Sequence, residues 1–575
     1  MCRARAGACD VAETCSGSTP QCPPDSFALA SFVCRPSSGA CDLEETCTGK
    51  APTCPVDRFL PPQTVCRHPQ GPCDVAESCT GSAPTCPADV LLSSSEVCRA
   101  ADGACDAEEH CTGSSASCPS DGFRTEGEVC RSAAGICDAT ETCTGTSTSC
   151  PEDNFSRAGT SCAQNGGNAC DGRGACVQCA NYCQKQVSCP GTNTTSISGT
   201  VFMPNGVDPL PNTLVYVPNA ALLPLPSGVS TCEPCSNLVS GSPLVSAVTD
   251  ATGHFTITNM PTGQDIPLVI QNGKWRREFT IPWVPSCINT PIPSSGPGQL
   301  RMPKNRTEGN IPRIALVTGG FAGLECVLTK MGLDTTEYGN GSATFDGRVH
   351  FYLADGNPGA RLDANTPTES ALWASQATMN AYDLIFFGCQ GSRFRRSSVL
   401  QQKLINYTNT GGRVIVNHYA FEWIYNVAPF SSTALWNVDQ PVNFTSDPQA
   451  AFIDDTYPPA QVLSQWLQHV APSSTPGQVR VSHLYTDFDG APAPSHVWFS
   501  LHDALHPNPV PMQFTFDTPV GSPPDQQCGR VLFTEYHTME NLPDSTVFPA
   551  ACDSAPLRPD ERLMEFMVFD QGTCR

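Results

Sequence analysis

The sequence predicts a multidomain chain with three kinds of structure in succession. A disulfide-rich repeat array with little regular structure comes first, then an all-β sandwich, then an α/β domain built on a doubly wound parallel sheet. Three observations support this order. A frame of four cysteines recurs five times at a step of 32 residues, short alternating strands begin near residue 195, and strands alternate with helical patterns after residue 312.

The cysteine frames define the array as residues 1–160. They open at Cys2, Cys34, Cys66, Cys98 and Cys130, and 26 of the 34 cysteines lie in the first 190 residues. We expect disulfides, because the segment has too few large apolar residues to fold without cross-links. Zinc is the alternative, but the repeated pattern contains neither C-x2–4-C pairs nor histidines. Pairing within a frame and pairing between frames both stay open.

Three carboxylates recur at fixed positions in every frame. Acids held close together by disulfides repel one another unless a cation lies between them, and oxygen ligands in a flexible loop suit Ca²⁺. The alternative is that these acids cap turns or remain solvated. The predicted calcium ligands are Asp10, Glu13 and Asp25; Asp42, Glu45 and Asp57; Asp74, Glu77 and Asp89; Asp106, Glu109 and Asp121; and Asp138, Glu141 and Asp153.

The repeated text C-D-x2-E-x-C-[ST]-G, followed by C-P-x-D-x-F, resembles the second half of the disintegrin domain of ADAM and snake-venom metalloproteinases. The resemblance implies an elongated, disulfide-dense arm with structural Ca²⁺, to which the carbonyls of Leu43 and Arg58 would add ligands in the second frame. The integrin-binding loop of that family corresponds to residues 34–41. Integrin binding is not expected, because no frame contains RGD, and no H-E-x-x-H helix for proteolysis occurs.

Two further segments follow the array. Residues 161–192 break the period and are expected to form a variant cysteine-rich module, in which zinc at Cys176, Cys179 and Cys183 is the alternative to disulfides. Residues 195–289 contain short β-branched runs separated by turn residues, which predicts an all-β sandwich.

The order I-S-G-T-V, P-N-T-L-V-Y-V-P, T-D-A-T-G-H-F-T-I and M-P-T-G resembles carboxypeptidase-regulatory-like domains, which are transthyretin-like sandwiches. The resemblance implies a spacer or binding module. Within this segment Cys232 and Cys235 have the spacing of a redox motif, and we expect a loop-closing disulfide. Residues 290–311, rich in Pro, Ser, Gly and Asn, are expected to be a linker.

Residues 312–575 show strands alternating with helices, which predicts the α/β domain. Strands are expected at 313–318, 350–354, 384–387, 414–416 and 531–533, and helices near 324–331, 400–407, 462–470 and 559–567. Ligands of such sheets bind at the carboxyl ends of the strands. Polar residues at these ends make Cys389, His418, Glu535 and His537 the candidate catalytic residues, as a nucleophile, bases and an orienting carboxylate. The alternative is that His418, His537 and Glu535 form a metal site.

The segments Y-D-L-I-F-F-G-C, G-G-R-V-I-V-N-H and G-R-V-L-F-T-E-Y-H resemble the class I glutamine-amidotransferase-like fold and its ThuA-like relatives. The family places its nucleophilic cysteine in a G-x-C-x-G elbow, where this chain has residues 416–420 with His418 at the centre. Cys389 ends the preceding strand, where the family supplies oxyanion contacts. The resemblance therefore implies a degenerate member without glutaminase activity.

Charge and compartment limit the function. The net charge is −23, and residues 1–160 hold 22 acidic against 10 basic residues, a balance of −12, which excludes nucleic acid as a partner. The sequence contains no transmembrane segment, and we expect that residue 1 lies inside a longer array whose signal segment is missing from this chain. These features predict a secreted or cell-surface protein that binds or adheres to an unknown protein or polysaccharide through a calcium-stabilised stalk, with a non-catalytic head. The alternative is a hydrolase-like enzyme with a Cys/His site in the C-terminal domain.

Overall fold

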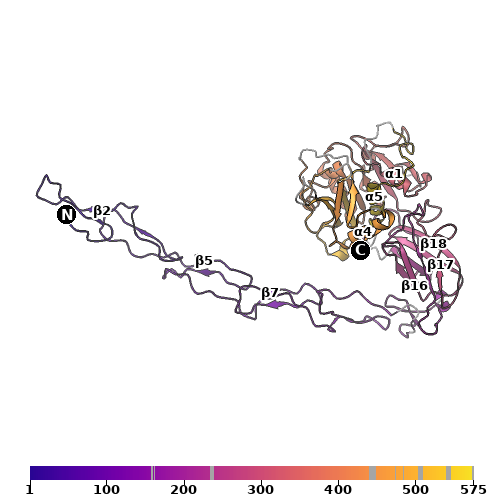
Figure 1. Cartoon of the computed structure of the whole chain (residues 1–575), viewed down its shortest axis with the longest axis horizontal. Coiled ribbons are helices and arrows are strands. Elements are labelled where there is room, and N and C mark those ends of the chain that lie inside the picture. Colours follow the sequence, from indigo (N-terminus) through magenta and orange to yellow (C-terminus); the bar gives the residue numbers. More distant parts are fainter. Residues whose placement is uncertain are drawn as a thin grey trace. The chain divides into compact units, whose positions relative to one another are not determined.

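The structure is a computed structural model that describes residues 1–156, 160, 162–179, 181–232, 238–342, 344–438, 449–472, 474–482, 485–502, 509–538 and 546–572. The chain forms two compact units, Met1–Phe155 and Ser156–Arg575 (Figure 1). The first unit is the repeat array, and the second holds the larger sheets. Among the described residues, no helix has both the length and the apolar character needed to cross a bilayer.

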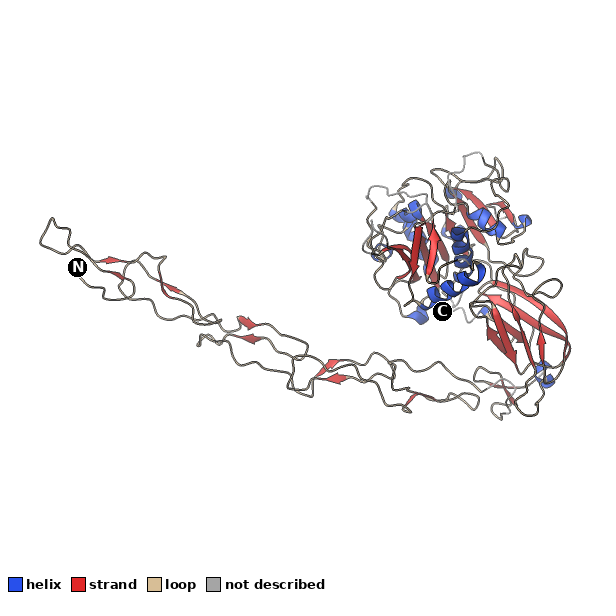
Figure 2. Cartoon of the chain, viewed as in Figure 1, coloured by secondary structure: helices blue, strands red, loops and turns tan. Residues whose placement is uncertain are grey.

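The array consists of short hairpins joined by loops (Figure 2). Each frame contributes strands of only two or three residues, because turn residues and cysteines leave little room for longer pairing. The strand pairs are β1 (Asp10–Val11) with β2 (Ser26–Phe27), β3 (Val33–Arg35) with β4 (Glu45–Thr46), β5 (Val65–Arg67) with β6 (Glu77–Ser78), β7 (Val97–Arg99) with β8 (Glu109–His110), and β9 (Val129–Arg131) with β10 (Glu141–Thr142).

Two kinds of disulfide cross-link the array, which confirms the predicted bridges and settles their pairing. The first cysteine of a frame pairs with the fourth, and the second pairs with the third cysteine of the next frame. Bridges within frames are Cys2–Cys22, Cys34–Cys54, Cys66–Cys86, Cys98–Cys118 and Cys130–Cys150. Bridges between frames are Cys9–Cys47, Cys41–Cys79, Cys73–Cys111 and Cys105–Cys143. A bridge closing a loop of this size stabilises the fold by about 3 kcal/mol.

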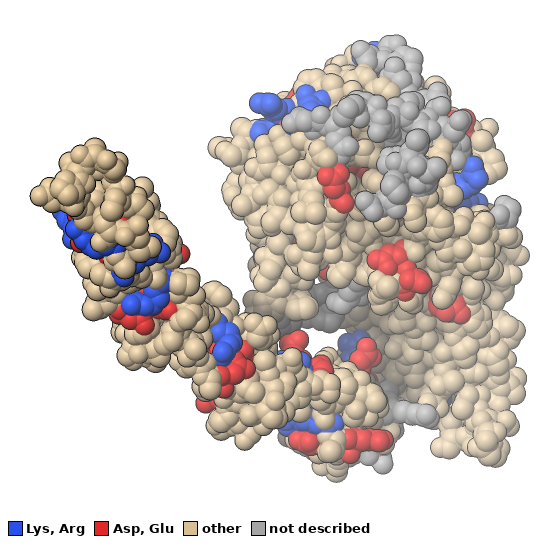
Figure 3. Space-filling view, turned by 60° about the vertical axis from the view of Figure 1, so that its left-hand side comes forward, with Lys and Arg blue, Asp and Glu red and all other residues tan. Residues whose placement is uncertain are grey.

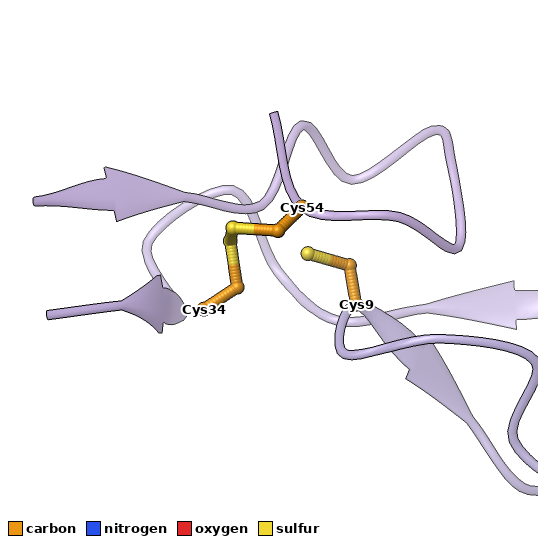
Figure 4. Close-up of side chains that lie close together, drawn as sticks. All are labelled: Cys9, Cys34 and Cys54. Atoms are coloured by element: carbon orange, nitrogen blue, oxygen red, sulfur yellow. A yellow bond between two sulfur atoms is a disulfide. The ribbon is translucent and has the colours of Figure 1, made fainter. Parts of the chain in front are cut away.

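The two kinds of bridge lie side by side at each junction. Figure 4 shows the sulfur of Cys9 pointing toward the Cys34–Cys54 disulfide. These sulfurs are grouped closely enough to suggest a metal site, but all three belong to disulfides and offer no thiolate. A backbone hydrogen bond also joins neighbouring frames, since the amide of Cys41 donates to the carbonyl of Pro84 at 2.9 Å.

Glycine permits this close approach, because a Cβ on Gly39 would clash with the Pro84 carbonyl. The same contact recurs at the other junctions described between frames one and five. Apolar packing contributes little to the array. Its buried non-polar residues are cysteines with the single addition of Ala28, and the large apolar side chain of Phe123 is 39% exposed.

The variant module also uses disulfides rather than zinc. Cys162 pairs with Cys176, Cys179 pairs with Cys183, and Cys189 reaches Cys287. Its elements are β11 (Ala169–Cys170), β12 (Cys176–Val177) and the 3₁₀ helix η1 (Asn181–Lys185).

Two sheets follow the module. The first has the order β16-β13-β19 and the second β15-β14-β17-β18. Side chains from both sheets, among them Ile197 and Val215, belong to one apolar core. The strands are β13 (Ser196–Thr200), β14 (Leu214–Pro218), β15 (Pro243–Val248), β16 (His254–Thr258), β17 (Gly263–Asn272), β18 (Trp275–Val284) and β19 (Asn289–Pro291).

Residues 290–311 differ from the expected linker. β19 pairs in parallel with β13, and Leu300, Met302 and Ile311 are fully or almost fully buried. This apolar triplet lies in the core that the middle sheets share with the C-terminal part. The Pro- and Ser-rich composition predicts a linker, but these three buried residues pack the segment against the rest of the fold.

The C-terminal sheet has ten strands in the order β21-β22-β20-β23-β24-β29-β28-β27-β25-β26. From β21 to β29 the neighbours are parallel, and the remaining four strands pair antiparallel. The strands are β20 (Ile314–Thr318), β21 (Tyr338–Asn340), β22 (Val349–Leu353), β23 (Leu384–Phe387), β24 (Arg413–Asn417), β25 (Gln449–Ile453), β26 (Gln478–Val481), β27 (His496–Leu501), β28 (Val510–Thr518) and β29 (Gly529–Thr534).

The sheet separates two apolar cores. Along β20, Ile314 and Leu316 face one core and Ala315 and Val317 face the other, as strand alternation requires. Side chains of α1, α4 and α5 join the first core, and those of α2 and α3 join the second. The helices are α1 (Leu324–Lys330), α2 (Gln376–Asn380), α3 (Ser398–Asn409), α4 (Pro458–Val470) and α5 (Pro559–Asp570), and the 3₁₀ helices are η3 (Thr335–Glu337), η4 (Glu369–Ala371), η5 (His418–Trp423), η6 (Phe430–Ser432) and η7 (Pro524–Gln526).

The sequence therefore predicts the parallel strands but not the antiparallel extension formed by β25 to β28. The finer class, a doubly wound α/β domain, stays a prediction. Cys232 also departs from expectation: it pairs with Cys528 rather than with Cys235, which lies outside the described residues. Cys326 pairs with Cys552.

His350 on β22 gives a pH prediction. The ring is fully buried, with Nε2 3.1 Å from the Gly347 carbonyl and Nδ1 3.1 Å from the Tyr382 hydroxyl. Burial, assisted by the positive charge of Arg313, lowers the pKa of His350 to about 4. An unfolded histidine takes up its proton near pH 6.5, so stability is complete above that pH and is lost as the pH falls toward 4.

We expect this residue to cost about 3 kcal/mol of unfolding free energy across that interval. Denaturant unfolding between pH 7 and pH 4 measures the loss, which His350→Gln should reduce. The exposed His469→Gln is the control. Equal pH dependence in the two variants would contradict the assignment.

Candidate functional site

The candidate site is formed at the carboxyl ends of three neighbouring strands. β23 leads to Cys389, β24 leads to His418, and β29 leads to Glu535 and His537. Because β23, β24 and β29 are parallel neighbours, their carboxyl ends meet at one edge of the sheet. The four sequence-predicted residues are therefore delivered to one place by the fold.

His418 occupies a sharp turn directly after β24. Its φ of 42° lies in the left-handed region that residues other than glycine seldom adopt. The preceding side chain holds this turn, since Asn417 Nδ2 donates to Thr534 Oγ1 at 2.8 Å and to the Tyr536 carbonyl at 2.7 Å. A strained turn between a strand and a helix is the backbone form of a nucleophile elbow, with an imidazole in place of the nucleophile.

Three side chains converge on the His418 ring. Cys389 Sγ lies 3.2 Å from His418 Nδ1, and His537 Nε2 lies 3.1 Å from the same nitrogen. On the other side of the ring, Asp487 Oδ2 lies 3.1 Å from His418 Nε2. Tyr485 stacks on the ring at a centroid distance of 3.6 Å. We call Cys389, His418, His537 and Asp487 the Cys–His cluster.

Glu535 is connected to the Cys–His cluster through the backbone of Asp487. Its Oε1 accepts a hydrogen bond from the backbone amide of Asp487 at 2.9 Å, so it positions the loop that carries Asp487. Its Oε2 is buried without a hydrogen-bond partner. Asp487 therefore lies nearer to the His418 ring than the predicted Glu535, whose orienting role stays a prediction.

Asp487 and Tyr485 were not among the predicted residues. Both lie in a loop that precedes β27, where no strand or helix pattern places a residue. The sequence shows only an aromatic and an acidic residue close together. Such a pair also occurs in exposed turns, so it does not predict a functional site.

The Cys–His cluster is closed to solvent. Cys389, His418 and Glu535 are 0% exposed, His537 is 1% exposed and Asp487 9%. Burial raises the pKa of Cys389 to about 12 and lowers the pKa of His418 well below its usual range. Burial also raises the pKa of Asp487 to about 7. In this state the pair is a thiol beside a neutral imidazole. The enzyme hypothesis requires convergence in an open cleft, and the residues converge but are buried.

The repeated carboxylates of the array contact a cation that belongs to the chain. In the second frame, Arg35 Nη1 lies 2.8 Å from Glu45 Oε2 and 3.1 Å from Asp57 Oδ1. Arg35 Nη2 donates to the carbonyl of Pro55 at 3.2 Å. The other frames repeat both ion pairs, through Arg3 with Glu13 and Asp25, Arg67 with Glu77 and Asp89, Arg99 with Glu109 and Asp121, and Arg131 with Glu141 and Asp153.

The first aspartate of each frame has a separate role. Asp42 Oδ2 accepts hydrogen bonds from the amide and hydroxyl of Ser38, at 2.8 and 2.7 Å, and these bonds lower its pKa. Its counterparts Asp10, Asp74, Asp106 and Asp138 accept the equivalent amide bond. These aspartates cap turns, as the alternative reading proposed.

The described geometry thus fits Ca²⁺ only in part. Two of the three carboxylates meet at one guanidinium nitrogen. The third gives Oδ2 to its own turn, and in frames one, two and five its Oδ1 is buried without a hydrogen-bond partner. Figure 3 shows the resulting pattern, with basic and acidic side chains adjacent along the array. The arginine directly after the first cysteine recurs in all five frames, so the sequence contained the signal for this contact.

Comparisons with known proteins give a weak likeness. No family model and no curated protein matches this chain. Among solved structures, a putative ThuA-like protein from Bacteroides uniformis is similar at 11% identity and a TM-score of 0.24, over 44% of this chain and 89% of that one. One from Parabacteroides merdae shares 14% identity at a TM-score of 0.24, over 40% and 84%. The mmIFT52 N-terminal domain is similar at 10% identity and a TM-score of 0.23, over 35% of this chain and 81% of that one.

Thiol reactivity tests the closed site. Among the described cysteines, Cys15 is free and exposed and Cys389 is free and buried. We expect iodoacetamide to modify Cys15 in the native, non-reduced chain and to spare Cys389 until the head is unfolded, because a buried thiol with a raised pKa presents no thiolate.

Peptide mapping by mass spectrometry measures the two rates separately. Cys15 serves as the internal control for reagent activity. Modification of Cys389 at a rate close to that of Cys15 would show that the site opens, and would favour the enzyme hypothesis.

Proposed function

We propose that the chain is an extracellular modular binding protein with a disulfide-linked arm and a non-catalytic head. The observation that carries the proposal is the set of bridges between frames, because each frame is covalently linked to its neighbours by more than the main chain. Such bridges form and persist in oxidising compartments. The absence of an apolar core in the array fits a segment that uses cross-links in its place.

The binding role belongs to the arm in this proposal. Five similar frames present the same exposed groups at regular intervals, so weak contacts of single frames can add up on a repetitive protein or polysaccharide surface. The resemblance to disintegrin domains supports an adhesive arm, and the resemblances to carboxypeptidase-regulatory-like and ThuA-like domains support a spacer and a head.

Binding is tested with the full chain on intact cells of several types. We expect retention on the surface of at least one type, and reduced retention when Cys73 and Cys111 are both replaced by alanine, because that junction then loses its cross-link. Cys389→Ala should leave retention unchanged. Absence of retention on every cell type, or dependence on Cys389 instead of the junction, would contradict the proposal.

The proposal also concerns the cation that neutralises the carboxylates of each frame. We infer that the arginine of the frame is this cation and that the frames need no added ion. Ca²⁺ is the alternative, in which the ion takes the place of the guanidinium between Glu45 and Asp57 and draws its remaining ligands from Asp42 and nearby carbonyls.

Limited proteolysis of the non-reduced chain distinguishes the arginine hypothesis from the Ca²⁺ hypothesis. If arginine is the cation, Arg67→Gln should raise cleavage in the third frame several-fold, while EDTA changes nothing. Arg58→Gln, an exposed arginine of the same array, is the matched control. If EDTA raises cleavage in all frames and Ca²⁺ restores resistance, the arginine proposal is wrong.

A hydrolase remains the second candidate because of one observation. Cys389, His418 and Asp487 follow one another as a nucleophile, a base and an orienting carboxylate do in cysteine hydrolases. Such an enzyme would have to open the buried site before substrate could reach Cys389.

A further inference from the structure

We propose that the Cys–His cluster is a zinc site, in which Cys389 Sγ, His418 Nδ1 and His537 Nε2 bind one Zn²⁺ inside the head. The inference goes beyond the binding function, since it concerns the closed site and not the arm. Its support is the geometry of the donor atoms, the orientation of His418 and the buried charge nearby.

Two of the three separations between the donor atoms are close to those that a tetrahedral ion needs. Zn–N bonds are about 2.0–2.1 Å and Zn–S bonds about 2.3 Å, so two ligand atoms on one ion are roughly 3.3–3.6 Å apart. The observed separations from His418 Nδ1 are 3.2 Å to Cys389 Sγ and 3.1 Å to His537 Nε2. An outward movement of a few tenths of an ångström would therefore admit the ion.

Asp487 lies behind the central ligand. Its Oδ2 is 3.1 Å from His418 Nε2, although the two atoms are not aligned for a hydrogen bond, and its carboxylate favours the tautomer with the proton on Nε2, which leaves the lone pair of Nδ1 facing Cys389 and His537. A carboxylate behind a ligating histidine is the usual support of a zinc site. Asp487 is itself held by its amide bond to Glu535 and by the bond from the Asn437 amide to its carbonyl at 2.7 Å.

Hydrogen bonds alone leave this group poorly satisfied. His418 Nδ1 has one lone pair and two neighbours, Cys389 Sγ and His537 Nε2. Either both neighbours donate a hydrogen to this lone pair, or one of them faces it with a lone pair of its own. Two carboxylates also lie buried here, and Glu535 Oε2 has no hydrogen-bond partner. A buried oxygen without a hydrogen-bond partner is costly, and a divalent cation bound nearby would stabilise the ionised form of these carboxyl groups.

The donor set selects the metal. One thiolate with two imidazoles suits a borderline-soft ion such as Zn²⁺, whereas Ca²⁺ and Mg²⁺ require oxygen ligands. On binding, the Zn–S bond replaces the S–H bond of Cys389, and the proton leaves to solvent. The Gly391 amide, 3.4 Å from the sulfur, is placed to donate to the thiolate so formed.

The test uses the full chain folded with and without added ZnCl₂ and then dialysed. We expect elemental analysis to find about one zinc per chain and zinc to raise the melting temperature. Loading with Co²⁺ should produce the near-ultraviolet band of a cobalt–thiolate bond. Cys389→Ala should lose the metal and the band, whereas Cys15→Ser, which removes the other described free thiol, should keep both.

A milder variant guards against loss of folding. Asp487→Asn should keep the fold, as judged by circular dichroism, and weaken zinc binding by about 10- to 100-fold. The proposal is overturned if the chain retains no zinc, or if Cys389→Ala and Cys15→Ser retain equal amounts. None of these outcomes affects cell-surface retention by the arm, so the binding proposal is judged separately.

Discussion

Oxidised sulfur is the constraint on which the array depends. A frame of 32 residues with strands of two or three residues cannot enclose an apolar core, and its buried positions are taken by cysteines and by the first aspartate and the glutamate of most frames, with Ala28 in addition. The bridges between frames extend the cross-linking from one repeat to the next, so that neither the fold of a frame nor its attachment to the next relies on side-chain packing. The arginine–carboxylate contacts then act on a backbone that is already fixed, which is the situation in which a partly exposed ion pair has the least conformational entropy to lose.

How much of this could be predicted differs between the two units. The recurrence of four cysteines establishes disulfides and repeats, but the pairing of Cys9 with Cys47 could not be inferred, because every frame offers the same four partners. The role of Arg35 could have been inferred from its recurrence after the first cysteine. The recurring acids predict an external ion, whereas the ion pairs of Arg35 place a cation of the chain beside Glu45 and Asp57.

In the second unit, buried parallel strands such as β20 and β23 are evident as continuous apolar runs. The antiparallel strands are less evident, because β25 and β26 alternate buried and exposed residues over only four or five positions. The placement of Cys389, His418 and His537 followed from the parallel order of the strands. Asp487 could not be placed, because a loop residue reaches its partner through the tertiary fold and leaves no periodic trace in the sequence.

Cys389 differs in its oxidation state from most of the protein's cysteines. Nearly all of the described cysteines are oxidised to disulfides, whereas Cys389 remains a thiol. Burial explains part of this, since a thiol without solvent contact meets neither an oxidant nor a partner sulfur. Burial does not explain why two histidines and a carboxylate accompany it, because an apolar pocket would protect a thiol at lower cost than buried polar groups. A site built from a strained His418, an orienting Asp487 and a preserved Cys389 has the composition expected of a ligand set. In a protein where most of the described cysteines form cross-links, a metal ion would give the sulfur of Cys389 the same structural role.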